Sequence, residues 1–144
     1  MENEVILDTD IIVDYLRKKP DLVATRLFHR IGEGRIKAHT TSISAFELYR
    51  GARLSPDPED KLLAVKSLIW TLSCLALDEA AANLASEISV ALQRKGESIE
   101  IRDLFIGAVA KTARLPLATK NVGHFKRIPD LDTMTPSDLL KRMK

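Results

Sequence analysis

The stretch that decides the fold is Val5-Ile6-Leu7-Asp8-Thr9-Asp10. Its first three residues form a short apolar segment that is typical of a strand, and it runs directly into an acidic turn. Residues 10–17 follow with apolar side chains at helical spacing. A strand that ends in carboxylates places negative charge at the carboxyl edge of a sheet, where open α/β folds build their sites. The opening therefore predicts both a strand and one edge of a site.

Strand-like and helix-like segments alternate along the rest of the chain. We expect strands at 5–7, 35–40, 75–77, 115–119 and 131–134, a short turn at 121–125, and helices at 10–17, 22–31, 42–54, 59–72, 79–95, 100–114 and from 136 onward. Asp21, Asp78 and either Thr41 or Ser42 are the expected helix caps. Strands separated by helices require crossover connections, which predicts a mainly parallel sheet covered on both faces.

Length and composition set limits on function. The chain has 144 residues, which predicts one domain over 1–144. Its net charge is only +2, so any contact with nucleic acid must come from a local patch. We find no signal peptide and no apolar run of membrane-spanning length, and we expect a cytoplasmic protein.

The single cysteine, Cys74, excludes an intramolecular disulfide. It stands in the apolar run 72–77, which we interpret as a buried strand, and we expect it to be a small core residue rather than a catalytic thiol.

Three acidic residues stand where a plain surface acid is less expected. Asp8 follows the first strand directly, and we favour it over Asp10 as the residue that points into the site. Glu47 and Asp103 lie within apolar stretches of predicted helices. Carboxylates gathered in a cleft repel one another, so such a group makes chemical sense when a divalent cation neutralises it. Glu100, one turn before Asp103, is explained by the helix dipole, and whether Glu100 or Asp10 also joins the site stays open.

Polar residues also follow the strand predicted at 115–119. Thr119 and Asn121 can place neutral oxygens near the acids. His124 comes next, but a lone histidine with two acids lacks the ligand spacing of a zinc site. Bases that the fold could bring to one rim, as a contact surface for a phosphate backbone, are Lys111, Arg114, Lys120, Lys126 and Arg127.

Together these segments resemble the PIN-domain nucleases, and most closely the ribonuclease toxins of virulence-associated-protein BC (VapBC) toxin–antitoxin pairs. The resemblance covers almost the whole chain. It is carried, in order, by ILDTD (6–10), SISAFELYRG (42–51), IRDLFIGAVA (101–110) and LATKNVGHF (117–125). It implies a three-layer α/β fold with a parallel sheet of about five strands.

The resemblance also implies a site. Asp8, Glu47 and Asp103 would be the metal ligands, and Thr9 and Thr119 polar supports. Asn121 stands where many relatives carry a fourth acid, which leaves the choice between one and two metals open. Mg²⁺ or Mn²⁺ suits oxygen-only ligands. The implied reaction is endonucleolytic RNA cleavage by a metal-activated water, leaving a 5′-phosphate.

The same resemblance implies partners. A homodimer and a cognate antitoxin are expected, and the helices on either side of residues 55–59 are the candidate antitoxin surface.

Two other functions remain open from the sequence. One is a metal-dependent phosphatase or phosphotransferase that forms an aspartyl-phosphate at Asp8. The other is a non-catalytic PIN-like module that binds nucleic acid or protein without cutting.

Overall fold

The computed structural model describes residues 3–144 and contains one parallel sheet in the order β3-β2-β1-β4-β5. The strands are β1 (Glu4–Leu7), β2 (Lys37–Thr41), β3 (Ser73–Leu75), β4 (Leu117–Ala118) and β5 (Thr133–Met134). Parallel neighbours need crossovers, and the helices supply them. The predicted α/β class with a parallel sheet is confirmed.

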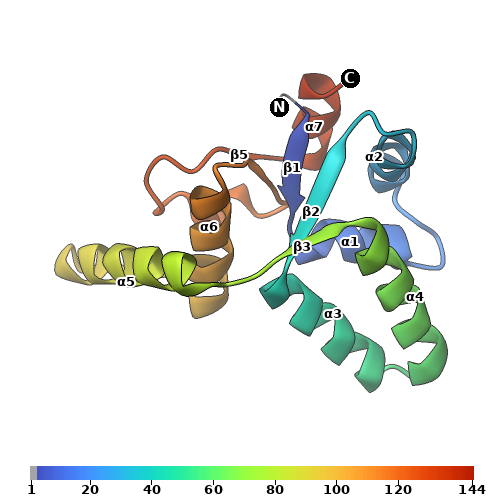
Figure 1. Ribbon diagram of the computed structural model, residues 1–144, viewed down its shortest axis with the longest axis horizontal. Coiled ribbons are helices and arrows are strands. Elements are labelled where there is room, and N and C mark those ends of the chain that lie inside the picture. Colours follow the sequence, from blue (N-terminus) through green and yellow to red (C-terminus); the bar gives the residue numbers. More distant parts are fainter. Residues whose placement is uncertain (1–2) are drawn as a thin grey trace.

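Helices lie on both sides of this sheet (Figure 1). They are α1 (Thr9–Leu16), α2 (Leu22–Gly32), α3 (Ser42–Leu54), α4 (Pro58–Thr71), α5 (Glu79–Arg94), α6 (Ile101–Ala113) and α7 (Pro136–Arg142), with a 3-10 turn, η1 (Val122–Phe125). One apolar core joins the sheet to α1–α4 and α7, and the other joins it to α5 and α6. The three-layer arrangement is therefore as predicted.

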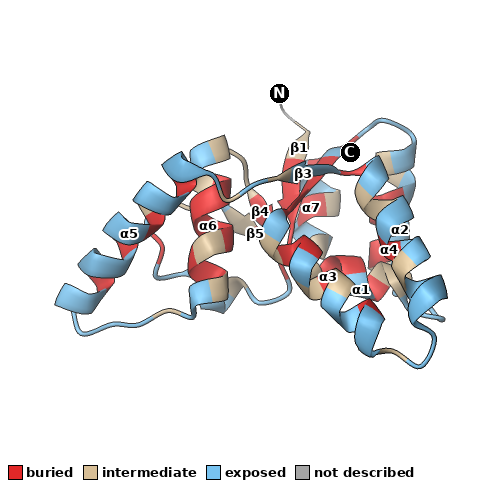
Figure 2. Cartoon of the chain, turned by 60° about the horizontal axis from the view of Figure 1, so that its bottom comes forward, coloured by how far each residue is buried: buried red, intermediate tan, exposed pale blue. Residues whose placement is uncertain are grey.

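Strand β1 serves both cores because its side chains alternate between faces. Val5 and Leu7 belong to the core with α1 and α2, and Ile6 belongs to the core with α6. All three side chains are fully buried. Figure 2 shows this buried material concentrated in the central strands and in the inner faces of the helices.

The carboxyl ends of β1 and β4 are held side by side. The backbone N–H of Asp8 donates to the carbonyl of Ala118 at 2.9 Å, and the N–H of Thr119 donates to the carbonyl of Met134. The chain leaves β1 toward β2 on one side, while β4 lies on the other. This is a topological switch point, where open α/β sheets leave a crevice at their carboxyl edge.

Short polar side chains start most of the helices. Asp21, Thr41 and Asp78 each accept a bond from a backbone N–H in the first turn of the helix that follows, as expected for caps. Thr41, rather than Ser42, caps α3. Asp8 is the cap of α1, so that helix begins at Thr9, one residue before the predicted start.

The prediction for the third strand is wrong in place and in burial. We expected it at 75–77, but β3 spans Ser73–Leu75, in register with residues His39–Thr41 of β2. It is an edge strand with a single neighbour. Cys74 is consequently exposed rather than a core residue, because an apolar run alone does not say on how many sides a strand is covered.

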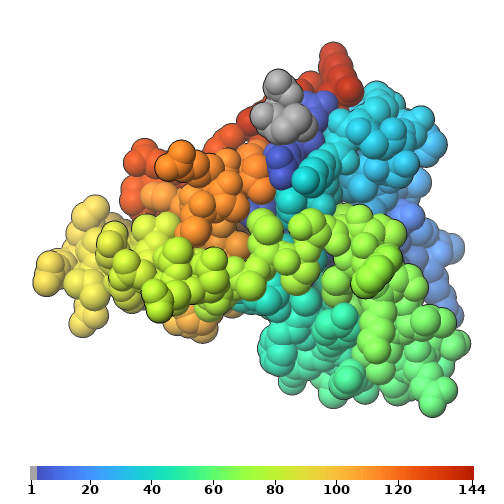
Figure 3. Space-filling model, viewed as in Figure 1, coloured from blue at the N-terminus to red at the C-terminus, as the bar shows by residue number. Residues whose placement is uncertain are grey.

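The outer surface has two lobes. Figure 3 shows α5 projecting as an arm from one side, with a hollow between this arm and α3. Trp70, near the end of α4, is 90% exposed. Among residues 3–144, every helix is too short or too polar to cross a membrane.

Candidate functional site

Four elements place polar side chains at the carboxyl edge of the sheet. Asp8 follows β1 and Thr119 follows β4, while Glu47 lies on α3 and Asp103 lies in the first turn of α6. The early turns of α3 and α6 reach the same end of the sheet (Figure 1). Asp8 is 1% exposed and Asp103 is 3% exposed. The structure therefore brings the three predicted acids to one place.

A single guanidinium lies among these acids. Arg102 donates from Nε to Oε2 of Glu47, from Nη1 to Oδ1 of Asp103 and from Nη2 to Oδ1 of Asp8, each at 2.7 Å. Its Nη2 also lies 3.2 Å from Oγ1 of Thr9. Each carboxylate thus directs one oxygen toward the same cation. The arrangement uses the fork of donors that only arginine offers.

Hydroxyl groups hold the other carboxylate oxygens. Thr119 donates from Oγ1 to Oδ2 of Asp8 at 2.8 Å, and Thr9 contacts Oε1 of Glu47 at 2.6 Å and Oγ of Ser44 at 2.8 Å. Thr119 and Ser44 are fully buried. Because Thr119 is fully buried and Thr9 is tied to the buried Ser44, the carboxylates of Asp8 and Glu47 have little freedom to turn.

The pKa values of Asp103 and Glu47 are shifted in opposite directions. Burial raises the pKa of Asp103, and the bond from Arg102 opposes this only in part. Burial also acts to raise the pKa of Glu47, but the bonds from Arg102 and Thr9 outweigh it and the pKa is lowered. Although burial alone would lower the pKa of Arg102, its bonds to Glu47, Asp8 and Asp103 raise it well above the ordinary value. Arg102 is a permanent cation.

Asn121 and Asp10 form a separate group beside the acids. Oδ2 of Asp10 accepts bonds from the N–H of Lys120 at 3.0 Å and from Nδ2 of Asn121 at 3.2 Å. Lys120 pairs with Asp14 at 2.7 Å. Burial, together with the charge of Asp8, raises the pKa of Asp10, and its Oδ1 is a buried atom without a hydrogen-bond partner in the described residues. Asn121 is linked to the acids through Thr119, whose Oγ1 accepts its N–H at 3.0 Å.

Two further candidates stand at the margin. His124 is exposed, with Nδ1 3.8 Å from Oδ2 of Asp103. Glu100 precedes α6 as an exposed cap residue whose side chain makes no capping bond. Neither is enclosed with the three buried or half-buried acids.

The fold does not bring all five candidate bases to one rim. Lys111 and Arg114 lie at the far end of α6 from Asp103; for Lys111, eight residues from Asp103, the separation along the axis is about 12 Å. Lys111 is directed to the carbonyl of Pro129, and Arg127 to that of Ser98. Helix α6 runs away from the carboxyl edge of the sheet, so its last turn cannot share that edge.

Arg102 and Ser44 are the residues that our sequence reasoning missed. For Arg102 a signal was present, because a base in the first turn of a helix opposes the helix dipole and needs another explanation. Ser44 carried no such signal, since a serine near a helix start is explained as a capping residue.

The donor set suits a hard divalent cation. Three carboxylates and two threonine hydroxyls supply oxygen atoms only, which is the chemistry of Mg²⁺ and Mn²⁺ sites. In residues 3–144 as they stand, no three His, Cys, Asp or Glu side chains form a group that could hold a metal ion. The guanidinium of Arg102 lies between the carboxylates of Asp8, Glu47 and Asp103.

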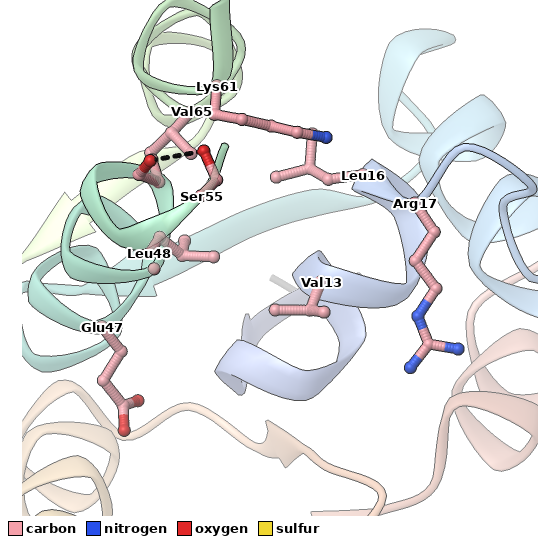
Figure 4. A pocket seen from close by; sticks show the side chains of 10 residues that line it. Val13, Leu16, Arg17, Glu47, Leu48, Ser55, Lys61 and Val65 are labelled. Carbon is pink, nitrogen blue, oxygen red and sulfur yellow. Dashed lines mark hydrogen bonds between the residues drawn. The ribbon is translucent and has the colours of Figure 1, made fainter. Parts of the chain in front are cut away.

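An apolar pocket opens next to the acids. Its walls come from α1, α3 and α4 and include Val13, Leu16, Leu48 and Val65. Figure 4 shows Glu47 at the end of this pocket that is remote from Lys61. Gly51 also lines it, and a Cβ at this position would meet no atom within 4 Å. The pocket is therefore open, and it leads toward the Glu47 side of the site.

Comparison with known proteins decides the family. The model for the PIN domain matches residues 5–131, a span that contains all four segments of the site. The chain belongs to the PIN-domain family. Among curated PIN-domain relatives, the tRNA(fMet)-specific endonuclease VapC of Shigella flexneri is 30% identical over 128 residues, covering 89% of this chain and 94% of its own. The protein of the same name from Salmonella typhimurium is 31% identical over 126 residues, covering 88% and 92%.

Solved structures of VapBC complexes contain chains of the same fold. The chain superposes on DNA-bound VapBC from Salmonella typhimurium with a TM-score of 0.81 and 28% identity, covering 92% of this chain and 98% of that chain. For VapBC-1 from nontypeable Haemophilus influenzae the TM-score is 0.78 at 26% identity, with coverage of 93% and 98%. The chain thus spans nearly the full length of these toxin–antitoxin components.

Proposed function

We propose that this PIN domain is a metal-dependent endoribonuclease and the toxin of a toxin–antitoxin pair. The observation that carries the proposal is the convergence of Asp8, Glu47 and Asp103 at the switch point of the sheet, where one guanidinium contacts all three. The relatives are named as ribonucleases or as a tRNA-specific endonuclease, which supports the same reaction. The expected substrate is RNA, and the expected product carries a 5′-phosphate.

Asp8, Glu47 and Asp103 would hold Mg²⁺ or Mn²⁺. Such a cation supplies Lewis acidity at the phosphate and lowers the pKa of an attacking water. The chain's own residues prepare the site. Thr119 fixes one oxygen of Asp8 and Thr9 fixes one oxygen of Glu47, which leaves the remaining oxygens directed inward. Asn121, exposed at the edge, offers a neutral amide near the substrate rather than a further negative charge.

Nothing in the geometry favours a phosphatase that uses Asp8 as nucleophile. Both carboxylate oxygens of Asp8 are already bonded, to Arg102 and to Thr119, and the side chain is almost fully buried. A nucleophile that receives a phosphoryl group must be approached along one free oxygen. Thr119 holds Oδ2 of Asp8, and Oδ1 faces the position of the Arg102 cation, as expected of a residue that binds a cation.

We also propose that the antitoxin covers α3 and α4, the helices on either side of residues 55–59. The open apolar pocket lies between these helices and α1. Phe46, Leu54 and Leu63 are large apolar side chains on the same two helices, each more than 60% exposed. Apolar surface of this kind is typical of a binding face. The structures that the chain resembles are toxin–antitoxin complexes, and a homodimer of the toxin is also expected.

The test is cleavage of defined RNAs by purified protein with Mn²⁺ or with EDTA, followed by mapping of the ends. Asp8→Asn and Asp103→Asn keep side-chain size, and Asn still caps α1. Each should lose metal-dependent cleavage by at least about 100-fold, corresponding to roughly 2.7 kcal/mol of lost transition-state stabilisation. Glu100→Gln is the matched control, since it removes an exposed acid three residues from Asp103, and it should cleave normally.

Full cleavage by Asp8→Asn or Asp103→Asn would contradict the assignment of these ligands. Cleavage in EDTA equal to that in Mn²⁺ would contradict metal dependence. Release of phosphate from a small phosphomonoester, with no shortening of RNA, would favour the phosphatase.

A further inference from the structure

Neither helix capping nor an ion pair outside the acidic cluster explains the position of Arg102. It lies in the first turn of α6, where the helix dipole disfavours a positive charge. The preceding residue, Ile101, is exposed, so burial of Ile101 does not determine where the Arg102 side chain lies. Every bond of its guanidinium goes to Asp8, Glu47, Asp103 or Thr9. Arg102 is therefore placed for the acids and not for the helix.

The charge balance of the cluster is incomplete with Arg102 alone. Three carboxylates face one guanidinium, and the exposed His124 is the other basic group within 4.0 Å of these acids among the described residues. Buried like charges that share one partner destabilise one another. A divalent cation would neutralise the same three carboxylates better than a single positive charge does. The guanidinium and the cation therefore compete for the same oxygens.

We propose that Arg102 is an internal counter-ion which occupies the cation position of the metal-free protein and yields it when Mg²⁺ or Mn²⁺ binds. This inference rests on the proposed metal site and adds a positioning residue to it. Arg102 keeps one oxygen of each of Asp8, Glu47 and Asp103 turned toward its guanidinium. The three carboxylates do not form a metal-holding group while Arg102 lies between them, so they would close on the cation as the guanidinium leaves.

The departure of Arg102 requires little movement of the fold. Its side chain is 29% exposed, so one side of the guanidinium already faces solvent. Rotation about the side-chain bonds suffices to move the guanidinium outward. The helix beneath it remains in place because Leu104 and Ile106 are buried in the core. By linkage, whatever free energy Arg102 contributes to the metal-free cluster is subtracted from the affinity for the cation.

The experiment measures binding rather than turnover. Calorimetric titration with Mn²⁺ is carried out on the wild-type chain and on Arg102→Met, which keeps an unbranched side chain and removes the guanidinium and its charge. The variant should bind Mn²⁺ on the order of tenfold more tightly, a typical size for a coupling between two ligands of one site. Its Tm in EDTA should fall, because three carboxylates lose their counter-ion. Its Tm should rise more on addition of Mn²⁺ than that of the wild type.

Two further variants make the result specific. Arg142, at the end of α7, pairs with Asp132 and lies away from the site. Arg142→Met should bind Mn²⁺ like the wild type. Arg102→Lys keeps the charge but lacks the planar fork of donors with which the guanidinium contacts all three carboxylates. Its affinity for Mn²⁺ should lie between those of the wild type and Arg102→Met. It also serves as the test if Arg102→Met does not fold.

The outcomes separate this inference from the proposed function. If the wild type binds Mn²⁺ and removal of Arg102 leaves that affinity unchanged or weakens it, Arg102 is not displaced and the inference is wrong. An equal gain in Arg142→Met would show a nonspecific charge effect and would also overturn it. If the folded wild type and both Arg102 variants give no Mn²⁺ binding, the proposed metal site itself fails.

Discussion

Thr119 shows how much of the site depends on one neutral side chain. It has no accessible surface, yet it joins two parts of the edge. Its Oγ1 donates to Asp8 and accepts the N–H of Asn121. Since β4 ends at Ala118, the hydroxyl stands at the first position beyond the strand. Thr119 thus fixes the orientation of the Asp8 carboxylate without adding charge.

Thr119→Val keeps the shape of the side chain and removes both bonds. Because Oδ2 of Asp8 is then left buried and unpaired, the free energy of unfolding should fall by about 1–3 kcal/mol. Urea denaturation monitored by circular dichroism measures the change. Thr119→Ser keeps the hydroxyl and should lose less. If Thr119→Val is as stable as the wild type, the bond to Asp8 does not hold that carboxylate.

At the scale of residues, the sequence could predict the acids but not their partner. Asp8, Glu47 and Asp103 are recognisable because acidic side chains are unusual beside apolar strand and helix segments. The role of Arg102 depends on residues 55 and 94 positions away in the chain. No local pattern carries that information, although its unfavourable place at a helix start is visible in the sequence.

Strand β3 shows the same limit at the scale of elements. The run 72–77 is as apolar as a buried strand, and only pairing reveals that β3 lies at the edge of the sheet beside β2 alone. Helix caps behave differently. Asp21 and Asp78 could be predicted because the capping bond is made within one helical turn. Local chemistry is readable from sequence, whereas the number of neighbours is not.

The edge position makes Cys74 accessible to reagents. In the native protein we expect iodoacetamide to alkylate it to one equivalent, as measured by mass spectrometry. Partial burial raises the pKa of its thiol, and the thiolate is the reactive form. The rate should therefore keep rising with pH beyond the point at which a cysteine in an unstructured peptide levels off. Complete protection of Cys74 at high pH in the folded protein would contradict an exposed β3.

For the whole molecule, the alternation of segments was enough to predict the layers. Helices that connect parallel strands must cross over the sheet, and the faces of a parallel sheet are normally both buried. The assignment of each helix to a face could not be read in the same way. It depends on the strand order β3-β2-β1-β4-β5, which the chain sets only when it folds.

Because β1 belongs to both cores, we expect the molecule to unfold in one step. Ile6→Ala and Leu7→Ala remove fully buried side chains from opposite faces. Each should lower the free energy of unfolding by roughly 2–5 kcal/mol, with a single urea transition and unchanged slope. Val13→Ala, at a 40% exposed position, is the control and should lose far less. Two separated transitions in either core variant would show that the faces are independent.

The near-complete exposure of Trp70, the single tryptophan of the chain, has a practical consequence. An indole that is already surrounded by water changes its emission little when the protein denatures, so fluorescence will be a poor monitor of unfolding here. The same indole becomes a native optical probe for anything that settles on the outer side of α4. A blue shift on mixing would report coverage of that surface without any attached dye.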